Sequence, residues 1–306
     1  MIKDLPDTST VAVSKELVKM RESGGAVTLG RVLTLVVKTD LGEPTEGAIE
    51  AANAASREHP CRVIVVASGE RTVESRLDAQ IRVGGDAGAS EVVVLNLYGE
   101  LADHGHSVVI PFLLPDTPVV TWWPGHAPAV PAQDSLGQLG HRRITDASHD
   151  GDAAAALASR RAGYAPGDSD IAWSQITPWR ALLASAFDRP PHTTVDSVKV
   201  TGPAESPSVD LLAGWLRSAL GAPTLRARGS FEVRIERSDG VLILAVDQNN
   251  NAVLSSPNRP DGRIAMMVRG ISDCLAEELR RLDPDEIYEL ALHGLTELDF
   301  VTEGAA

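Results

Sequence analysis

Two short apolar runs, with a helix-forming segment between them, constrain the fold of this chain more than any other feature. The runs at 31–37 and 61–67 are almost continuously apolar and rich in valine, and the segment 44–58 is rich in alanine and glutamate. A strand, a helix and a strand at this spacing form a βαβ unit. Strands without polar alternation fit a sheet that is covered on both faces. We therefore predict an α/β fold whose first part is a parallel or mixed sheet with covering helices.

The residues around this unit extend the same pattern. A helix is predicted to begin at residues 9–10, where Ser and Thr can cap it, and to end at the glycine pair 24–25. Three further strands are expected at 78–83, 91–97 and 118–123. The remaining expectations are a short helical piece, an edge element and two helices, at 104–114, 142–146, 152–162 and 178–187, with 163–170 as a turn. Helices that alternate with strands are typical of α/β proteins.

The last third of the chain shows a different order of elements. Short strands follow one another here, and Asp239-Gly240 is a strong hairpin signal between two of them. The expected elements are a strand, a helix that Gly221 ends, three strands and two helices, at 193–200, 208–220, 230–237, 241–247, 252–256, 271–281 and 284–292. This order predicts a smaller α+β domain with antiparallel strands.

The domain limits follow from the proline-rich segment 188–192, which has the composition of a linker. We predict an α/β domain at 1–190 and a smaller α+β domain at 193–306. The boundary can fall anywhere within 150–192, because the helices before the linker can pack on either side. No internal repeat and no heptad tract divides the sequence further.

The chain is acidic along its whole length. It carries 28 lysines and arginines against 42 aspartates and glutamates, a formal net charge of −14. Such a surface repels phosphate backbones and anionic lipid, so we predict no nucleic-acid partner and no membrane partner. The first residues lack a basic segment followed by an apolar run, and the most apolar stretch, 107–123, is broken by three prolines. We expect a cytoplasmic protein without a membrane span.

Common catalytic and cofactor motifs are absent from the sequence. There is no Gly-x-Gly-x-x-Gly, no Gly-x-Ser-x-Gly and no His-Glu-x-x-His, and the glycines at 84–88 have the wrong spacing for a dinucleotide loop. The one close histidine pair, His104 and His106, needs ligands from elsewhere in the chain to hold a metal. Exposed or core-packed histidines are the simpler interpretation. We predict no catalytic residue, no cofactor and no metal site.

The two cysteines carry no sign of a disulfide framework or a zinc site. Cys61 and Cys274 lie far apart, and no Cys-x-x-Cys occurs. We predict that both are buried free thiols.

Two arginine pairs follow a long segment without basic residues. No Lys or Arg occurs within 83–141, whereas Arg142-Arg143 and Arg160-Arg161 come soon after it. Paired guanidinium groups can bind an anionic ligand or an acidic partner. Solvated charges at the edge of an element are the alternative.

Tryptophan is concentrated in the middle of the chain. Only 12 of the 306 residues are Phe, Trp or Tyr, yet four of the five tryptophans lie between Trp122 and Trp179. Core packing is one explanation, and strand alternation would then bury one ring of Trp122-Trp123 and expose the other. A partner surface is the second, because Trp, Tyr and Arg dominate interface hot spots. The predicted partner-binding residues are Trp122, Trp123, Arg142, Arg143, Tyr164, Asp168, Asp170, Trp173, Trp179 and Arg180.

Long stretches of the sequence closely resemble the glucose-6-phosphate dehydrogenase assembly protein family, OpcA. The strongest is 107–125, which runs from Ser107-Val108-Val109 to Trp122-Trp123-Pro124-Gly125. The other stretches are 30–35, 59–66, 142–146, 163–173, 176–183 and 274–288. The resemblance therefore covers nearly the whole chain.

The resemblance implies a non-catalytic partner of glucose-6-phosphate dehydrogenase that promotes its assembly and activation in the oxidative pentose phosphate pathway. Thioredoxin control, proposed for the cyanobacterial branch, is not carried over, because the only two thiols, Cys61 and Cys274, lie in runs typical of a buried strand start and a helix. One alternative is a sugar-phosphate-binding sensor or enzyme of the same pathway, with Arg142, Arg143 and Arg160 on the phosphate. A scaffold that binds pathway enzymes without changing their kinetics is another. The sequence leaves a homo-oligomer open.

Overall fold

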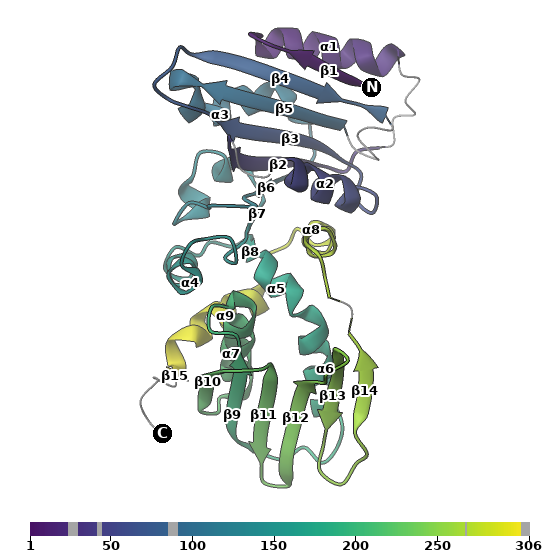
Figure 1. Ribbon diagram of the computed structural model, residues 1–306, viewed down its shortest axis with the longest axis vertical. Coiled ribbons are helices and arrows are strands. Elements are labelled where there is room, and N and C mark those ends of the chain that lie inside the picture. The colour runs from purple at the N-terminus through teal and green to yellow at the C-terminus, as the bar shows by residue number, and fades with distance from the viewer. Residues whose placement is uncertain (24–29, 42–44, 85–90, 267, 301–306) are drawn as a thin grey trace. The chain divides into compact units, whose positions relative to one another are not determined.

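The computed structural model describes most of the chain, which forms two compact units (Figure 1). The described residues are 1–23, 30–41, 45–84, 91–266 and 268–300. Unit 1 comprises Met1–Asp150, Ala165–Ile171 and Gly270–Pro284, and unit 2 comprises Gly151–Tyr164, Ala172–Arg269 and Asp285–Ala306. The predicted glycine end of the first helix and most of the glycine run at 84–88 lie outside the described residues. Each unit is made of three separate segments of the chain. The predicted domain limits stay a prediction.

Unit 1 is built on an eight-stranded mixed sheet, as predicted for an α/β fold. The strand order is β1-β4-β5-β3-β2-β6-β7-β8. The strands span Ile2–Leu5, Leu33–Asp40, Cys61–Ser68, Arg76–Arg82, Glu91–Tyr98, Val119–Trp122, Arg142–Thr145 and Asp168–Asp170, numbered β1 to β8. The pairs from β5 to β8 are parallel, whereas β1 and β4 are antiparallel to their neighbours. The segment predicted as an edge element, β7, is not at the edge, because it lies between β6 and β8. The edge strand is β8, which has three residues and lies within 163–170, the segment predicted as a turn.

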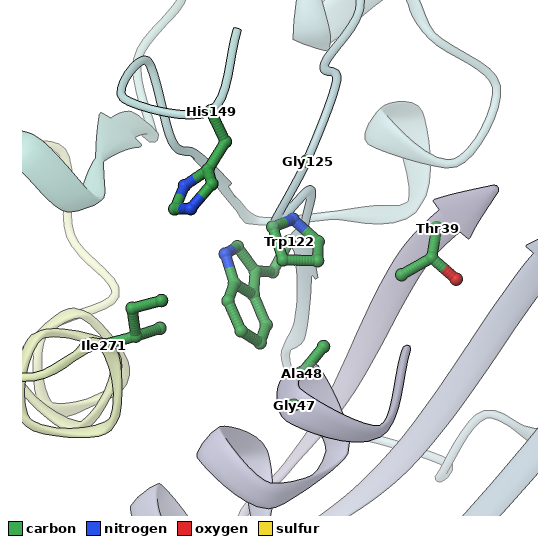
Figure 2. Close-up of a pocket in the computed structure, with 8 residues that line it drawn as sticks. Thr39, Gly47, Ala48, Trp122, Gly125, His149 and Ile271 are labelled. Atoms are coloured by element: carbon green, nitrogen blue, oxygen red, sulfur yellow. The ribbon is translucent and has the colours of Figure 1, made fainter. Parts of the chain in front are cut away.

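The order of connections creates a switch point beside β2. The chain leaves β2, forms helix α2 (Thr45–Ala55) and adds β3 on one side; later it returns to add β6 on the other side. The connections after these two neighbouring parallel strands therefore diverge. In open α/β sheets a crevice forms where the carboxyl ends of such strands separate. Thr39 and Trp122 stand at these two strand ends (Figure 2).

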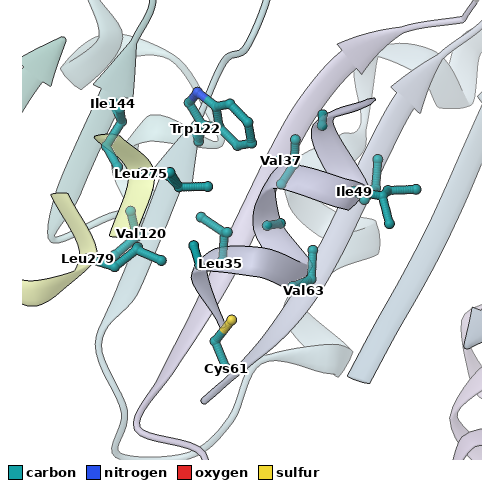
Figure 3. Close-up of a cluster of buried hydrophobic side chains, with 14 of the residues drawn as sticks. Leu35, Val37, Ile49, Cys61, Val63, Val120, Trp122, Ile144, Leu275 and Leu279 are labelled. Carbon is teal, nitrogen blue, oxygen red and sulfur yellow. The ribbon is translucent and has the colours of Figure 1, made fainter. Parts of the chain in front are cut away.

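Both faces of this sheet are covered, as the apolar runs predict. Leu35 and Val37 of β2 pack in one cluster with Ile49 of α2 and Leu275 of α8 (Ile271–Arg280), which Figure 3 shows. Val36 points to the opposite face, into a cluster with residues of helix α1 (Thr10–Ser23). Short helical turns complete unit 1: α3 (Gly105–Val109) and the 3₁₀ turns Gly99–Asp103, Ile110–Phe112, Pro131–Gln133 and Gly137–Leu139.

Unit 2 contains a seven-stranded, mostly antiparallel sheet, as predicted for the end of the chain. Its order is β14-β13-β12-β11-β9-β10-β15. Strands β9 to β15 span Val195–Gly202, Thr224–Arg228, Glu232–Arg237, Gly240–Val246, Asn251–Ser255, Gly262–Ala265 and Leu298–Phe300. Among the described strands of unit 2, only the pairs of β10 with β9 and with β15 are parallel.

Four helices of unit 2 complete it. They are α4 (Ala153–Ala162), α6 (Thr177–Phe187), α7 (Pro207–Leu220) and α9 (Glu286–Gly294), with Leu295–Glu297 as a 3₁₀ turn after the last. Gly221 ends α7 in the left-handed conformation, with φ of 64°. Helices α7 and α9 approach so closely that a Cβ on Gly214 would lie 2.2 Å from the Ala291 carbonyl oxygen. Glycine is therefore required at this crossing. The short helix α5 (Ile171–Gln175) spans the junction between the two units' segments.

Candidate functional site

The predicted partner-binding residues divide by exposure. Seven are buried: Trp122, Trp123, Arg142, Arg143, Asp168, Asp170 and Trp173. Tyr164, Trp179 and Arg180 are half-buried. The partner-binding role of the ten residues stays a prediction, but direct contact with another protein is open chiefly to the three that reach the surface.

The expectation of one exposed ring at the end of β6 is wrong. Trp122 is 0% exposed and Trp123 is 2% exposed. Strand β6 lies inside a sheet that is covered on both faces, so Trp122 joins the cluster with α8. The Trp123 backbone N–H donates to the Ile144 carbonyl, 3.0 Å away, and its ring approaches Gly137. Both rings therefore serve as core.

Arg142 is held by a carboxylate from a distant part of the chain. Its Nε and Nη2 atoms donate to one oxygen of Glu278 on α8, with an Nε distance of 2.9 Å. Nη1 donates to the Asp283 carbonyl, 3.1 Å away. Both charged side chains are only 3% exposed. This ion pair joins α8 to β7 within unit 1.

Arg143 is also bound by a carboxylate and by main-chain carbonyls, which lie closer to it in the sequence. Its Nε donates to Asp168 of β8, and its two terminal nitrogens donate to the carbonyls of Gly140 and Pro166, at 3.0 and 2.6 Å. The second Asp168 oxygen accepts from the Ala165 backbone, 2.9 Å away. Every branch of the Arg143 guanidinium is thus occupied.

Because of these contacts, Arg142 and Arg143 are already bound to carboxylates and are not available to hold the phosphate of a sugar phosphate. Arg142 and Arg143 stand at the start of β7, away from the carboxyl ends of the strands, and Arg160 is buried in α4. A phosphate would have to displace buried carboxylates, which is costly. Asp170 is also structural, because it accepts hydrogen bonds from the Thr145 hydroxyl at 2.6 Å and the Ala147 backbone at 3.1 Å.

Unit 2 holds an aromatic group around Trp173. The Arg180 guanidinium lies 3.6 Å from the Trp173 ring centroid, and Tyr288 of α9 lies 5.8 Å from it on another side. The Trp173 indole N–H donates to Asp285, 2.8 Å away. The other oxygen of Asp285 caps α9. Tyr164 in turn packs edge-on against Tyr288, with centroids 6.3 Å apart.

Sequence reasoning missed Tyr288 and Asp285 as parts of this group. Asp285 follows Pro284 at the start of a helix, and an N-cap aspartate is a signal that the sequence does contain. Its second contact, to an indole more than a hundred positions earlier, leaves no local trace.

Trp179 is the tryptophan of the predicted set that reaches the surface. It lies in the first turn of α6 and packs against Phe231, with ring centroids 4.4 Å apart. Phe231 is also half-buried. Because the pair is packed and still partly exposed, its rings are held in place before any partner binds. We name Trp179, Phe231 and Arg180 the α6 patch.

Both cysteines are buried thiols that form no disulfide, as predicted. Burial raises the pKa of the Cys61 thiol to about 12, and the charge of Arg31 opposes this only partly. The thiolate is the reactive form, so the Cys61 thiol is inert near neutral pH.

We therefore expect native protein at pH 8 to show no reaction with a chromogenic disulfide such as dithionitrobenzoate, and unfolded protein in urea to release two equivalents of the chromophore. A fast-reacting equivalent in the native protein would contradict the burial of these thiols.

Neither a metal cluster nor a membrane-spanning helix is found among the described residues. No group of three or more His, Cys, Asp or Glu side chains there is placed to hold a metal ion. Asp103, next to His104, forms an ion pair with Arg71, and His126 lies 3.0 Å from Asp150. No helix in this part of the chain has the length and apolar character needed to cross a bilayer.

Comparison with solved structures gives matches of low sequence identity. One, described as glucose-6-phosphate 1-dehydrogenase from Mycobacterium avium, has a TM-score of 0.50 and 11% identity, and the match covers 89% of this chain and 94% of that chain. Another, an oxidoreductase from Sinorhizobium meliloti, has a TM-score of 0.43 and 10% identity, over 87% and 95% of the two chains. At such identities the first likeness shows the fold alone. No curated protein sequence gives a significant match.

Two family models match consecutive parts of the chain. The model of the glucose-6-phosphate dehydrogenase subunit N-terminal domain matches residues 52–162, and the model of the C-terminal domain matches 166–292. Together they span far more than half of the sequence and include most of the stretches that carry the predicted resemblance. The family prediction is confirmed: this chain belongs to the OpcA family of glucose-6-phosphate dehydrogenase assembly proteins.

Proposed function

We propose that this chain is a non-catalytic subunit that binds glucose-6-phosphate dehydrogenase, promotes its assembly and activates it. The observation that carries the proposal is the match of both subunit domain models, one after the other, along a single chain. The sequence supports it, since none of the common catalytic motifs occurs in it. The dehydrogenase would perform the chemistry, and this chain would act on it by binding.

Activation by binding needs only a difference in affinity. If the subunit binds the active or assembled form of the dehydrogenase more tightly than the inactive form, the population shifts toward the active form. A coupling free energy of about 1–3 kcal/mol changes the apparent substrate affinity about 5–150-fold. The same coupling makes the substrate strengthen the complex by an equal factor. No proton or electron transfer by this chain is required.

The α6 patch is the contact that we propose for the dehydrogenase. Large aromatic side chains and arginine contribute most to binding free energy at protein interfaces. Trp179 and Phe231 offer a packed pair of rings, and Arg180, the next residue after Trp179, is fixed over the buried Trp173 ring. Tyr164, which is half-buried, would extend the contact. The buried residues of the predicted set would act through the fold of their own unit.

A tryptophan pair in unit 2 tests this assignment. Trp179→Ala is expected to weaken the complex with dehydrogenase from the same source at least 30-fold, about the 2 kcal/mol typical of a hot spot. Trp215→Ala is the matched control, because Trp215 is a half-buried tryptophan of α7 in the same unit. Affinity is measured by titration of labelled subunit, with circular dichroism as the folding check. Equal affinities for folded Trp179→Ala and wild type would contradict the role of the patch.

A further inference from the structure

A cavity of about 360 Å³ lies in unit 1 at the switch point of the sheet. Thr39 at the end of β2 and Trp122 at the end of β6 line it, together with the first turn of α2 and the loop that follows β7 (Figure 2). Ligands of open α/β sheets bind in the crevice outside the carboxyl ends of the strands, where the connections diverge. The cavity is at the lower end of the size range of small-molecule sites, about 300–1,000 Å³.

A buried donor without a partner lies in the cavity wall. The Trp122 side chain is 0% exposed, and its Nε1 has no hydrogen-bond partner among the described residues. Buried N–H groups are nearly always paired in proteins, so an unpaired one in a cavity wall marks a place where an acceptor can bind. Figure 2 shows the nitrogen edge of the indole turned toward the His149 imidazole, across the space that both line. A ligand acceptor placed there would satisfy this N–H.

His149 supplies a second oriented polar group. Its Nδ1 lies 2.9 Å from a carboxylate oxygen of Asp146, which is 1% exposed. A buried carboxylate that accepts from one ring nitrogen fixes the imidazole and leaves the other nitrogen for a ligand. The His149 side chain itself is 53% exposed, so a ligand can reach it.

The first turn of α2 gives the cavity an end suited to an anion. The first N–H groups of an α-helix have no partner within the helix, and its dipole favours negative charge there. Gly47 and Ala48 line the cavity, and a Cβ on Gly47 would meet no atom within 4 Å. The backbone is thus open to close approach. No lysine or arginine is among the lining residues, so main-chain N–H groups would hold the charge.

The walls favour a flat heteroaromatic group over a sugar. Ala48, Pro124, Ile271 and the indole of Trp122 make most of the lining apolar. A hexose phosphate needs partners for four hydroxyls, against two in a nucleoside monophosphate, and the Thr39 hydroxyl already lies 3.2 Å from that of Thr45. A purine or pyrimidine base has apolar faces and ring acceptors at its edge. It can therefore bury its faces here and accept from the indole.

We propose that unit 1 binds a nucleoside monophosphate in this cavity, with the base against Ile271 and Pro124, a base acceptor on Trp122 Nε1 and the phosphate at the first turn of α2. This site uses none of the residues of the α6 patch. Its occupancy is therefore a property of the chain that can be tested without the dehydrogenase.

Calorimetric titration of the full chain tests the ligand class. The probes are AMP, GMP, CMP and UMP, with adenosine, glucose 6-phosphate and inorganic phosphate as comparisons. We expect saturable binding of at least one nucleoside monophosphate, binding of its nucleoside at least tenfold weaker, and no binding of glucose 6-phosphate or phosphate in the same range. No binding of the four nucleotides at millimolar concentration would overturn the proposal. So would tighter binding of glucose 6-phosphate, or equal binding of nucleotide and nucleoside.

Two variants place the ligand. Gly47→Leu adds a side chain at a residue that lines the cavity and has free space around its Cβ position, and it is expected to weaken binding more than 30-fold. Gly151→Leu, also with nothing within 4 Å, is the matched control and should bind as wild type. Trp122→Phe keeps a smaller apolar ring and removes the Nε1 donor, which no described residue uses, so binding should weaken about tenfold. Wild-type affinity in folded Gly47→Leu would overturn the site.

Discussion

Glu278→Ala is expected to lower the free energy of unfolding by about 3–5 kcal/mol, because it leaves the Arg142 guanidinium buried without its carboxylate. Removing one member of a buried ion pair costs far more than the pair contributes, since the remaining charge stays out of water. The loss should appear in urea unfolding followed by circular dichroism. Arg142→Ala should have an effect of similar size, since it leaves the Glu278 carboxylate buried without the guanidinium.

The matched control is an exposed ion pair made by another residue of the same helix. Glu58 pairs with Arg280 of α8 at 2.9 Å, but both side chains are more than half exposed. Glu58→Ala should leave the unfolding midpoint almost unchanged, because water screens an exposed pair. The double variant Arg142→Met with Glu278→Leu should recover much of the stability lost in Glu278→Ala, since an apolar pair leaves no buried charge. Equal losses for Glu278→Ala and Glu58→Ala would contradict the burial of this ion pair.

Trp173→Ala is expected to cost about 3–5 kcal/mol of stability, as is usual when a buried aromatic ring is removed from a core. The variant also loses the stacking of Arg180 on the ring and the hydrogen bond to Asp285. Trp173→Phe keeps most of the apolar volume and should lose less. Urea unfolding of the two variants, compared with Trp179→Ala, measures the difference.

The stability of Trp173→Ala decides how binding data on the aromatic residues are interpreted. A loss of activation in Trp173→Ala cannot be assigned to a partner contact if the variant is partly unfolded. Trp179→Ala removes a half-buried ring and should stay close to wild type in stability. If Trp173→Ala proved as stable as Trp179→Ala, the description of Trp173 as core would be wrong.

The central elements of unit 1 could be predicted because their sequence pattern and their packing agree. Strands β2 and β3 are apolar on both sides, and the structure covers both faces of the sheet with helices and loops. Strand β8 could not be predicted in this way. Its residues, Asp168-Ser169-Asp170, have low strand propensity, and they pair with β7 because Arg143 and Thr145 bind their carboxylates.

Two features of the candidate site could not be predicted from the local sequence pattern: the burial of both rings at the end of β6 and the partner of Arg142. Alternation implies an exposed ring only where one face of a strand meets water, and β6 lies in a sheet that the apolar strands already indicated to be covered. The pairing of Arg142 with Glu278 joins positions 136 residues apart. Such a contact has no sequence signal, so the arginine pairs look equally suited to a ligand and to solvent.

The decisive experiment for activation measures initial rates of glucose-6-phosphate dehydrogenase across substrate concentration, with and without a saturating amount of this chain. The enzyme should come from the same source, and elution mass should establish that a complex forms. We expect a complex with a lower half-saturating substrate concentration or a higher maximal rate. A complex with identical rate curves would contradict activation and leave a scaffold. No complex between two folded proteins would contradict the proposed function itself.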